Sequence, residues 1–153
     1  MASRSTVLVA KDISKSYGDR IIIDHLSLTV HEGEAVALTG RNGAGKSTVL
    51  RMLVGADRPS SGTIEVLGKK VSETNPEFRR NVATVIDDLD FFPDLSVVEH
   101  LHLLARAHGL VDADALVDEV LEEVQLVPQS GQLPGTLSSG QRRRLGLATA
   151  LVR

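Results

Sequence analysis

Hydrophobic and polar residues alternate over short runs near the start of the chain. Within the segment 7–30, Leu26, Leu28 and Val30 share one face of an extended backbone. The turn sequence SYGDR at 16–20 divides this segment into two apolar runs. The pattern therefore predicts two short strands that pair as an antiparallel edge unit.

Continuous apolar runs then alternate with one helical pattern. The runs AVALT at 35–39 and VATVI at 82–86 are typical of strands buried on both faces. Between them, STVLRMLV at 47–54 has the period of a helix and is followed by Gly55, a suitable residue for a helix end. The segment PSSGTIEVLGKKV at 59–71 returns to a strand pattern. This order predicts an α/β core.

The pattern becomes helical from about Leu95 onward. Ser96 and Glu99 have the spacing of a capping box, in which each side chain bonds to the backbone N–H of the other residue. A second helix is predicted in 113–126, where apolar residues recur every four positions and acidic residues occupy the opposite face. A third helix is predicted in 141–153, after a polar linker containing glycine.

Composition narrows the class of protein. The 153 residues are 42% hydrophobic and 24% charged, close to globular averages, and they form the length of one ordinary domain. The net charge of −3 gives no basic excess, so no nucleic-acid partner is expected. Cysteine is absent, which excludes disulfides and thiolate chemistry. No signal peptide or membrane-spanning run is present, so membrane association is expected only through a partner.

A glycine-rich segment, TGRNGAGKST at 39–48, separates the first buried run from the helix that follows. Gly40, Gly45, Lys46 and Ser47 match the P-loop pattern G-x-x-x-x-G-K-[ST]. Glycines allow successive backbone N–H groups to point at one anion, and the helix N-terminus adds partial positive charge. Lys46 is the expected cation for the β- and γ-phosphates, and the Ser47 hydroxyl is an expected Mg²⁺ ligand. The P-loop alone leaves kinases, GTPases, helicases and transport ATPases open.

A second motif separates these classes. The sequence LSSGQRRRLGLATAL at 137–151 closely resembles the signature sequence of ATP-binding cassette (ABC) proteins, commonly LSGGQ, and the arginine-bearing helix after it. Together with GRNGAGKST and the SGTIEVLGKKV region, the resemblance extends over essentially the whole chain.

The resemblance implies roles for particular residues toward ATP and Mg²⁺. Tyr17, the single tyrosine, occupies the position of the aromatic residue that stacks on adenine in ABC proteins. The triphosphate is expected to contact Gly40, Asn42, Gly43, Ala44, Gly45, Lys46, Ser47 and Thr48. Because two cassettes of this family dimerise head to tail around two nucleotides, a second cassette's ATP is expected to meet Ser138, Ser139, Gly140 and Gln141.

The chain departs from the family after VATVI. ABC proteins usually place a glutamine there that contacts Mg²⁺ and the attacking water, whereas this chain has Asp87 and Asp88. Asp87 is therefore a candidate catalytic residue beside Lys46 and a candidate metal ligand beside Ser47. A carboxylate is shorter and charged, which puts the rate of hydrolysis in doubt. The segment 91–93, FFP, lies where a transporter's coupling helix is expected to rest.

Several elements that the family carries after the signature helix lie beyond Arg153. They are an apolar strand ending in a second Mg²⁺-binding aspartate (the Walker B strand), the glutamate that activates water, and a histidine on the γ-phosphate. We therefore expect a cassette that is incomplete at its C-terminus. The 153-residue chain alone is expected to bind ATP without hydrolysing it.

These observations lead to one expected architecture and function. The fold class is α/β, a P-loop NTPase three-layer sandwich of the ABC ATPase type, with a β edge unit and P-loop core in 1–94 and a helical subdomain in 95–153. The expected function is the ATP-binding subunit of an ABC transporter, cytoplasmic and held at the inner face of the membrane by a transmembrane partner subunit. The alternatives are a cassette that only binds or regulates, and a soluble ABC protein that acts on the ribosome or DNA.

Overall fold

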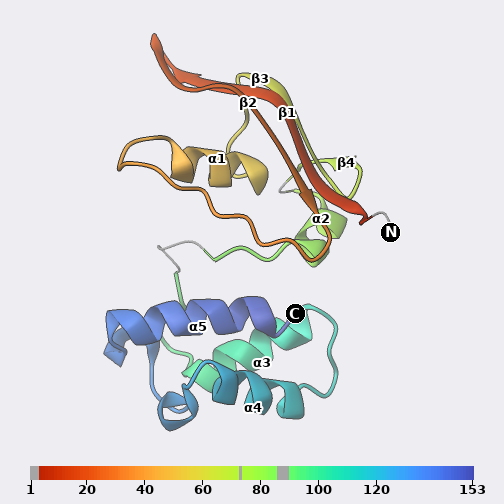
Figure 1. Cartoon of the computed structure of the whole chain (residues 1–153). Helices are drawn as coiled ribbons and strands as arrows, with labels where there is room; N and C mark the ends of the chain where they lie inside the picture. Colours follow the sequence, from red (N-terminus) through yellow and green to blue (C-terminus); the bar gives the residue numbers. More distant parts are fainter. Residues whose placement is uncertain (1–3, 73, 86–89) are drawn as a thin grey trace. The chain divides into compact units, whose positions relative to one another are not determined.

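The computed structural model describes residues 4–72, 74–85 and 90–153, which divide into two compact units, Met1–Val82 and Ala83–Arg153 (Figure 1). The first unit contains β1 (Thr6–Tyr17), β2 (Arg20–His31), α1 (Lys46–Leu53), β3 (Ser61–Val66), β4 (Lys69–Lys70) and α2 (Pro76–Asn81). The second contains α3 (Val97–Ala107), α4 (Asp114–Glu123), the 3₁₀ turns η1 (Val127–Gln129) and η2 (Pro134–Thr136), and α5 (Ser139–Leu151).

The first unit is built on an antiparallel sheet with the strand order β2-β1-β3-β4. β1 and β2 form a hairpin in which Tyr17 pairs with Arg20, and β1 pairs on its other side with β3. The predicted antiparallel edge unit is therefore confirmed. Helix α1 covers the sheet, and its buried residues Val49, Met52 and Leu53 form one cluster with Ala10, Ile13, Ile23 and Ile64 of the three strands (Figure 1).

A local distortion shapes the β1–β2 hairpin. The pairing of the two strands shifts between Ala10 and Ile13. Asp12 and His25, which are not paired with each other in the register, both have left-handed backbone, with φ values of 52° and 49°. Nδ1 of His25 lies 2.7 Å from Oδ1 of Asp12, so the two distorted positions are joined by their side chains. Gly62 of β3 packs directly against this bulge, because a Cβ on Gly62 would lie 2.4 Å from the carbonyl oxygen of Asp12.

Two predicted strands do not form. Residues 35–39 have no strand conformation, and Val36 is 50% exposed, whereas the continuous apolar pattern predicted a buried strand. Residues 82–85, the described part of the second run, follow the end of α2 at Asn81 and also have no strand conformation. A strand requires a hydrogen-bonded partner, and the described part of the chain offers neither segment one. Among the described residues the sheet is wholly antiparallel, and neither apolar run that was predicted as a buried strand belongs to it.

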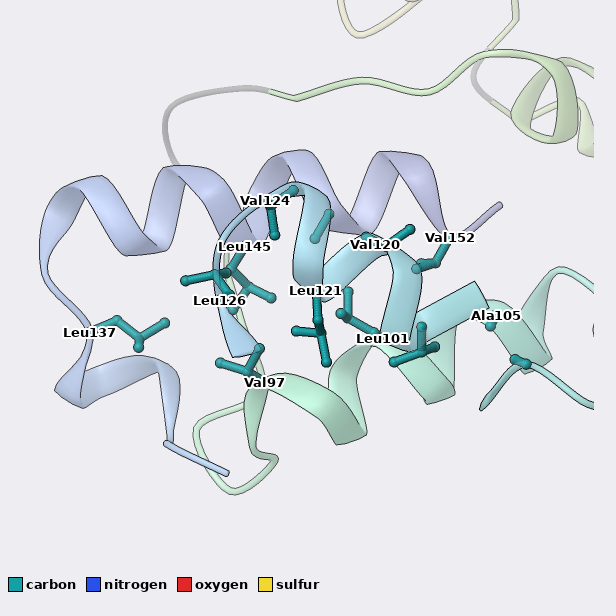
Figure 2. Packing of buried hydrophobic residues seen from close by; sticks show 13 residues of the cluster. Val97, Leu101, Ala105, Val120, Leu121, Val124, Leu126, Leu137, Leu145 and Val152 are labelled. Carbon is teal, nitrogen blue, oxygen red and sulfur yellow. The ribbon is translucent and has the colours of Figure 1, made fainter. Parts of the chain in front are cut away.

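The second unit is a helical bundle with its own core. α3, α4 and α5 pack around the buried side chains drawn in Figure 2, among which Val97, Leu101, Val117, Leu126, Leu145 and Val152 are almost completely inaccessible to solvent. The predicted capping box opens α3: the backbone N–H of Ser96 donates to Glu99 Oε2 at 2.7 Å, and Ser96 Oγ accepts from the N–H of Glu99. All three predicted helices are present. Within the described ranges, none of the helices is long and apolar enough to cross a membrane.

Candidate functional site

The glycine-rich segment forms a loop that ends in α1. Gly45 is the N-cap of α1 and has a φ of 90°, a conformation that costs an L side chain about 1–2 kcal/mol. A Cβ at this position would also lie 2.6 Å from Cδ1 of Ile23 in β2. Glycine at 45 therefore lets the start of α1 lie directly against the sheet.

Lys46 closes this loop from within. Its ammonium group donates hydrogen bonds of 2.8 Å to the carbonyl oxygens of Gly40 and Arg41. Both acceptors are neutral carbonyl oxygens, and a positively charged ammonium group is attracted more strongly by an anionic oxygen at the same distance. The lysine is thus held at the loop by partners that a phosphate oxygen can replace or join.

The N-terminus of α1 is suited to an anion. No side chain caps it, and no acidic residue lies in its first turn. Its partial positive charge is therefore not offset by side chains of its own helix. The neighbouring Ser47 is exposed and Thr48 half-buried, so the Ser47 hydroxyl is accessible to a ligand.

Tyr17 lies at the end of β1 and is 54% exposed. Its hydroxyl donates a 2.5 Å hydrogen bond to Oδ2 of Asp57, whose Oδ1 lies 2.6 Å from Nζ of Lys15. The hydrogen bond to Asp57 raises the pKa of Tyr17. The bonds from Lys15 and Tyr17 lower the pKa of Asp57 to about 2.

One local pattern in the sequence points to part of this cluster. Lys15 precedes Tyr17 by two positions, a spacing that places both on the same face of a strand, although the turn sequence at 16–20 predicted a turn at Tyr17. Asp57 follows α1 and is separated from Tyr17 by 40 positions, so no local pattern connects them. Sequence reasoning missed both Lys15 and Asp57.

A cavity of about 620 Å³ adjoins Asp57 without reaching the P-loop. Its lining comes from the end of α1, the loop after it, and the β3–β4 region, including Met52, Arg58, Ile64 and Val71. None of the residues 40–48 lines it. The candidate phosphate site is therefore an open loop rather than this hollow.

The signature residues form the start of α5 in the second unit. Ser138 is the N-cap: its Oγ accepts from the N–H of Gln141 at 3.3 Å, and its own N–H donates to Gln141 Oε1 at 2.7 Å. This is a second capping box, S-x-x-Q, which sequence reasoning missed although the pattern is plainly present. Ser138, Ser139 and Gly140 are exposed, so the helix end is accessible although its own side chains cap it.

Two arginines after the signature, Arg142 and Arg144, make local contacts. The Arg142 guanidinium lies 5.9 Å from the centre of the Phe91 ring. Nη1 of Arg144 donates to the carbonyl oxygens of Val124 and Gln125, at 3.3 and 3.0 Å. Arg144 thus satisfies carbonyls at the C-terminal end of α4, where a cation is favoured.

The predicted site residues fall in three groups. The loop 40–48 and Tyr17 belong to the first unit, and Ser138 to Gln141 belong to the second. Asp87 and Asp88 lie outside the described residues.

Comparison with known proteins agrees with these motifs. The family model described as "ABC transporter" matches residues 23–153. The bacitracin transport ATP-binding protein BcrA of Bacillus licheniformis is 37% identical over 97% of this chain. The Nod factor export ATP-binding protein I of Cupriavidus metallidurans is 39% identical, also over 97% of the chain.

Solved structures give the same result. A structure described as the ATP binding subunit of an ABC transporter is 30% identical, with a TM-score of 0.85, and the match covers 96% of this chain and 62% of that one. The cbiO1 protein of Clostridium perfringens, described as part of an ABC transporter complex, is 23% identical with a TM-score of 0.75, a likeness of fold. The chain spans about half the length of the curated relatives it matches, 48% of BcrA and 50% of the Nod factor protein.

Proposed function

Because the chain belongs to the ABC transporter family, we propose that it binds MgATP at residues 40–48, as part of the ATP-binding subunit of a membrane transporter. The observation that carries the proposal is the position of Lys46, whose ammonium group lies against the carbonyls of Gly40 and Arg41 at the N-terminus of α1. A cation, exposed backbone and a positive helix end in one loop support binding of a triphosphate.

The donor set of the loop fits a metal–triphosphate complex. Asn42, Gly43 and Ala44 are exposed, so the loop backbone can be approached by phosphate oxygens, although the N–H of Ala44 already donates to the carbonyl oxygen of Arg41 at 3.1 Å. The Ser47 hydroxyl would hold Mg²⁺, which supplies charge neutralisation between the β- and γ-phosphates when bound. That Asp87 also contacts Mg²⁺ and the attacking water stays a prediction.

Tyr17 would stack on the adenine. Its ring is more than half exposed at the end of β1. Stacking of a base on an aromatic ring contributes about 1–3 kcal/mol, and it tolerates different bases. Tyr17 therefore adds affinity for the base to the affinity for phosphate at the loop.

The signature end of α5 would complete the site of a second cassette. The exposed residues Ser139 and Gly140 support this role, since they lie in the first turn of a helix and contribute no negative charge. Ser138 and Gln141 bond to each other, so their side chains can reach a phosphate only if the capping box opens.

The proposed partners are a second cassette and a transmembrane subunit. The relatives named above are ATP-binding proteins of transport and export systems, which supports a transmembrane partner. Phe92 is 60% exposed in the segment where a coupling helix is expected, which supports contact with such a partner at this position. Localisation at the membrane would follow from that contact.

The test is binding of MgATP to the chain and to Lys46→Ala, measured by isothermal titration calorimetry. Loss of a charge-assisted bond of about 1.5–3 kcal/mol predicts an affinity at least about tenfold weaker. Lys69→Ala removes the same charge from an exposed pair with Glu77 and serves as the control. Equal affinity of Lys46→Ala and the parent would refute the proposal.

A further inference from the structure

Tyr17 is held by side chains that the family motifs do not include. Its hydroxyl donates to Oδ2 of Asp57 at 2.5 Å, while Oδ1 of Asp57 accepts from Nζ of Lys15 at 2.6 Å and from the backbone N–H of Arg58 at 2.8 Å. Lys15 also donates to the carbonyl oxygen of Arg58 at 2.6 Å. The carboxylate of Asp57 therefore joins the end of β1 to the loop after α1.

Asp57 is a firm anchor in this network. Its side chain is 20% exposed and that of Lys15 only 11%, so the ion pair is better shielded from solvent than an ordinary surface pair. The pKa of Asp57 is about 2, so the carboxylate stays ionised at every pH where the protein is expected to work. A charged acceptor gives the Tyr17 hydroxyl a stronger bond than a neutral acceptor would.

The same lysine restricts how a base can approach the ring. Nζ of Lys15 lies over the Tyr17 ring, 5.0 Å from its centre. One face of the ring is thus covered by the cation, and the side chain is nevertheless 54% exposed. A flat base can stack only on the opposite face.

We propose that Asp57 is a positioning residue for nucleotide binding: it fixes the Tyr17 ring, with Lys15 beneath one face, so that the other face is presented to the adenine. This inference rests on the proposed function, in which Tyr17 stacks on the base. Asp57 and Lys15 act through Tyr17 and make no contact with the phosphates.

The role predicts a selective loss of affinity. Without the Asp57 carboxylate, the ring is free to rotate, and binding must supply the free energy of ordering it. Tyr17→Phe keeps the aromatic face and removes the tether, so it is expected to behave like Asp57→Ala. Each change should lower the affinity for MgATP about three- to tenfold, which is the contribution of one hydrogen bond. The affinity for a triphosphate without a base should stay unchanged.

The experiment measures two ligands, MgATP and magnesium tripolyphosphate, by calorimetry on the chain and on Tyr17→Ala, Tyr17→Phe, Asp57→Ala and the double variant Tyr17→Phe/Asp57→Ala. We expect the ratio of the affinity for MgATP to that for magnesium tripolyphosphate to fall alike in Tyr17→Phe and Asp57→Ala, and no further in the double variant. Asp19→Ala, which removes the same charge from the turn beside Tyr17, is the control and should leave the ratio unchanged.

Each outcome has a distinct meaning. If Tyr17→Ala lowers the ratio but Asp57→Ala and Tyr17→Phe do not, Tyr17 stacks on the base and the positioning role of Asp57 is wrong. If neither Tyr17→Ala nor Lys46→Ala lowers the affinity for MgATP, the proposed function itself is wrong. If Asp57→Ala does not fold, Tyr17→Phe decides alone, because it removes the tether while the ion pair of Asp57 with Lys15 stays.

Discussion

The backbone N–H of Phe92 donates a 2.8 Å hydrogen bond to Nε2 of His100, while Nδ1 of the same ring lies 2.9 Å from the carbonyl oxygen of Ser96. A backbone N–H can only donate and a carbonyl can only accept, so the ring is neutral and carries its proton on Nδ1. His100 is 4% exposed and packs against the rings of Phe91 and Phe92. One buried histidine thus holds the segment that presents Phe92 to solvent.

His100→Phe should destabilise the second unit. The ring shape is retained, but the part-buried N–H of Phe92 loses its acceptor, at a cost of about 1–3 kcal/mol. The carbonyl oxygen of Ser96 keeps the backbone bond from the N–H of residue 100. His100→Gln can restore an acceptor for Phe92 and should recover part of the loss. Urea unfolding measures the free energy of unfolding of both variants. His102→Phe, on the more exposed side of α3, is the control, and an equal effect of the two phenylalanine variants would contradict the account.

Gly62→Ala should cost markedly more stability than Gly68→Ala. Both glycines have left-handed backbone, with φ values of 84° and 73°. Alanine in this conformation destabilises the fold by about 1–2 kcal/mol at either position. At Gly62 the Cβ would also lie 2.4 Å from the carbonyl oxygen of Asp12, whereas at Gly68 nothing lies within 4 Å. Overpacking adds about 1–3 kcal/mol. The difference in melting temperature between the two variants measures the effect of the contact with Asp12. Similar melting temperatures would show that this contact does not limit the residue at position 62.

The His25–Asp12 pair should make the stability of the first unit depend on pH. The hydrogen bond to Asp12, followed by the charges of Asp12 and Asp24, raises the pKa of His25 above its ordinary value of 6.5. The folded state therefore binds the proton more tightly, and the stabilisation is complete below that value and lost as pH rises through the raised pKa.

Asp12→Asn tests this, since asparagine tolerates the left-handed backbone. We expect the variant to be less stable than the parent at about pH 5.5 and nearly equal to it at about pH 9. In an NMR titration the pKa of His25 should fall toward its ordinary value. A destabilisation of the same size at both pH values would show that the charge of His25 is not involved.

Gln141→Glu should separate the stability of α5 from its proposed role. Glutamate keeps the oxygen that accepts from Ser138 and adds negative charge at a helix N-terminus, which stabilises helices by about 0.3–1 kcal/mol. The same charge would repel the γ-phosphate of a second cassette's ATP. We expect a higher melting temperature together with weaker ATP-dependent association with an intact cassette, measured by analytical ultracentrifugation. Unchanged association would place Gln141 outside that contact.

Local patterns predicted the elements whose partners lie nearby in the sequence. The Ser96–Glu99 capping box joins two residues that are three positions apart, within one helix turn, and it forms as this spacing indicates. The same logic applied to Ser138 and Gln141 would have found the second capping box. Helix α2 was also missed, although Asn75 and Pro76 form an N-cap and a first helical residue that are typical of a helix start.

Interactions between distant residues could not be predicted in this way. A run such as AVALT has the composition of a buried strand, but its conformation depends on whether another strand pairs with it. The tether from Tyr17 to Asp57 likewise depends on how β1 and the loop after α1 meet in space. The family resemblance assigned a role to Tyr17 without indicating what orients its ring.

The contact of Arg144 with the end of α4 bears on how the helical unit moves. Arg144 lies one turn after the signature residues and reaches two carbonyls beyond α4, while Leu145, Ala148 and Val152 of the same segment are buried in the shared core. A rotation of α5 would have to carry α4 with it or break both polar and apolar contacts at once. Any displacement of the signature end is therefore expected to carry the three helices together as one rigid body.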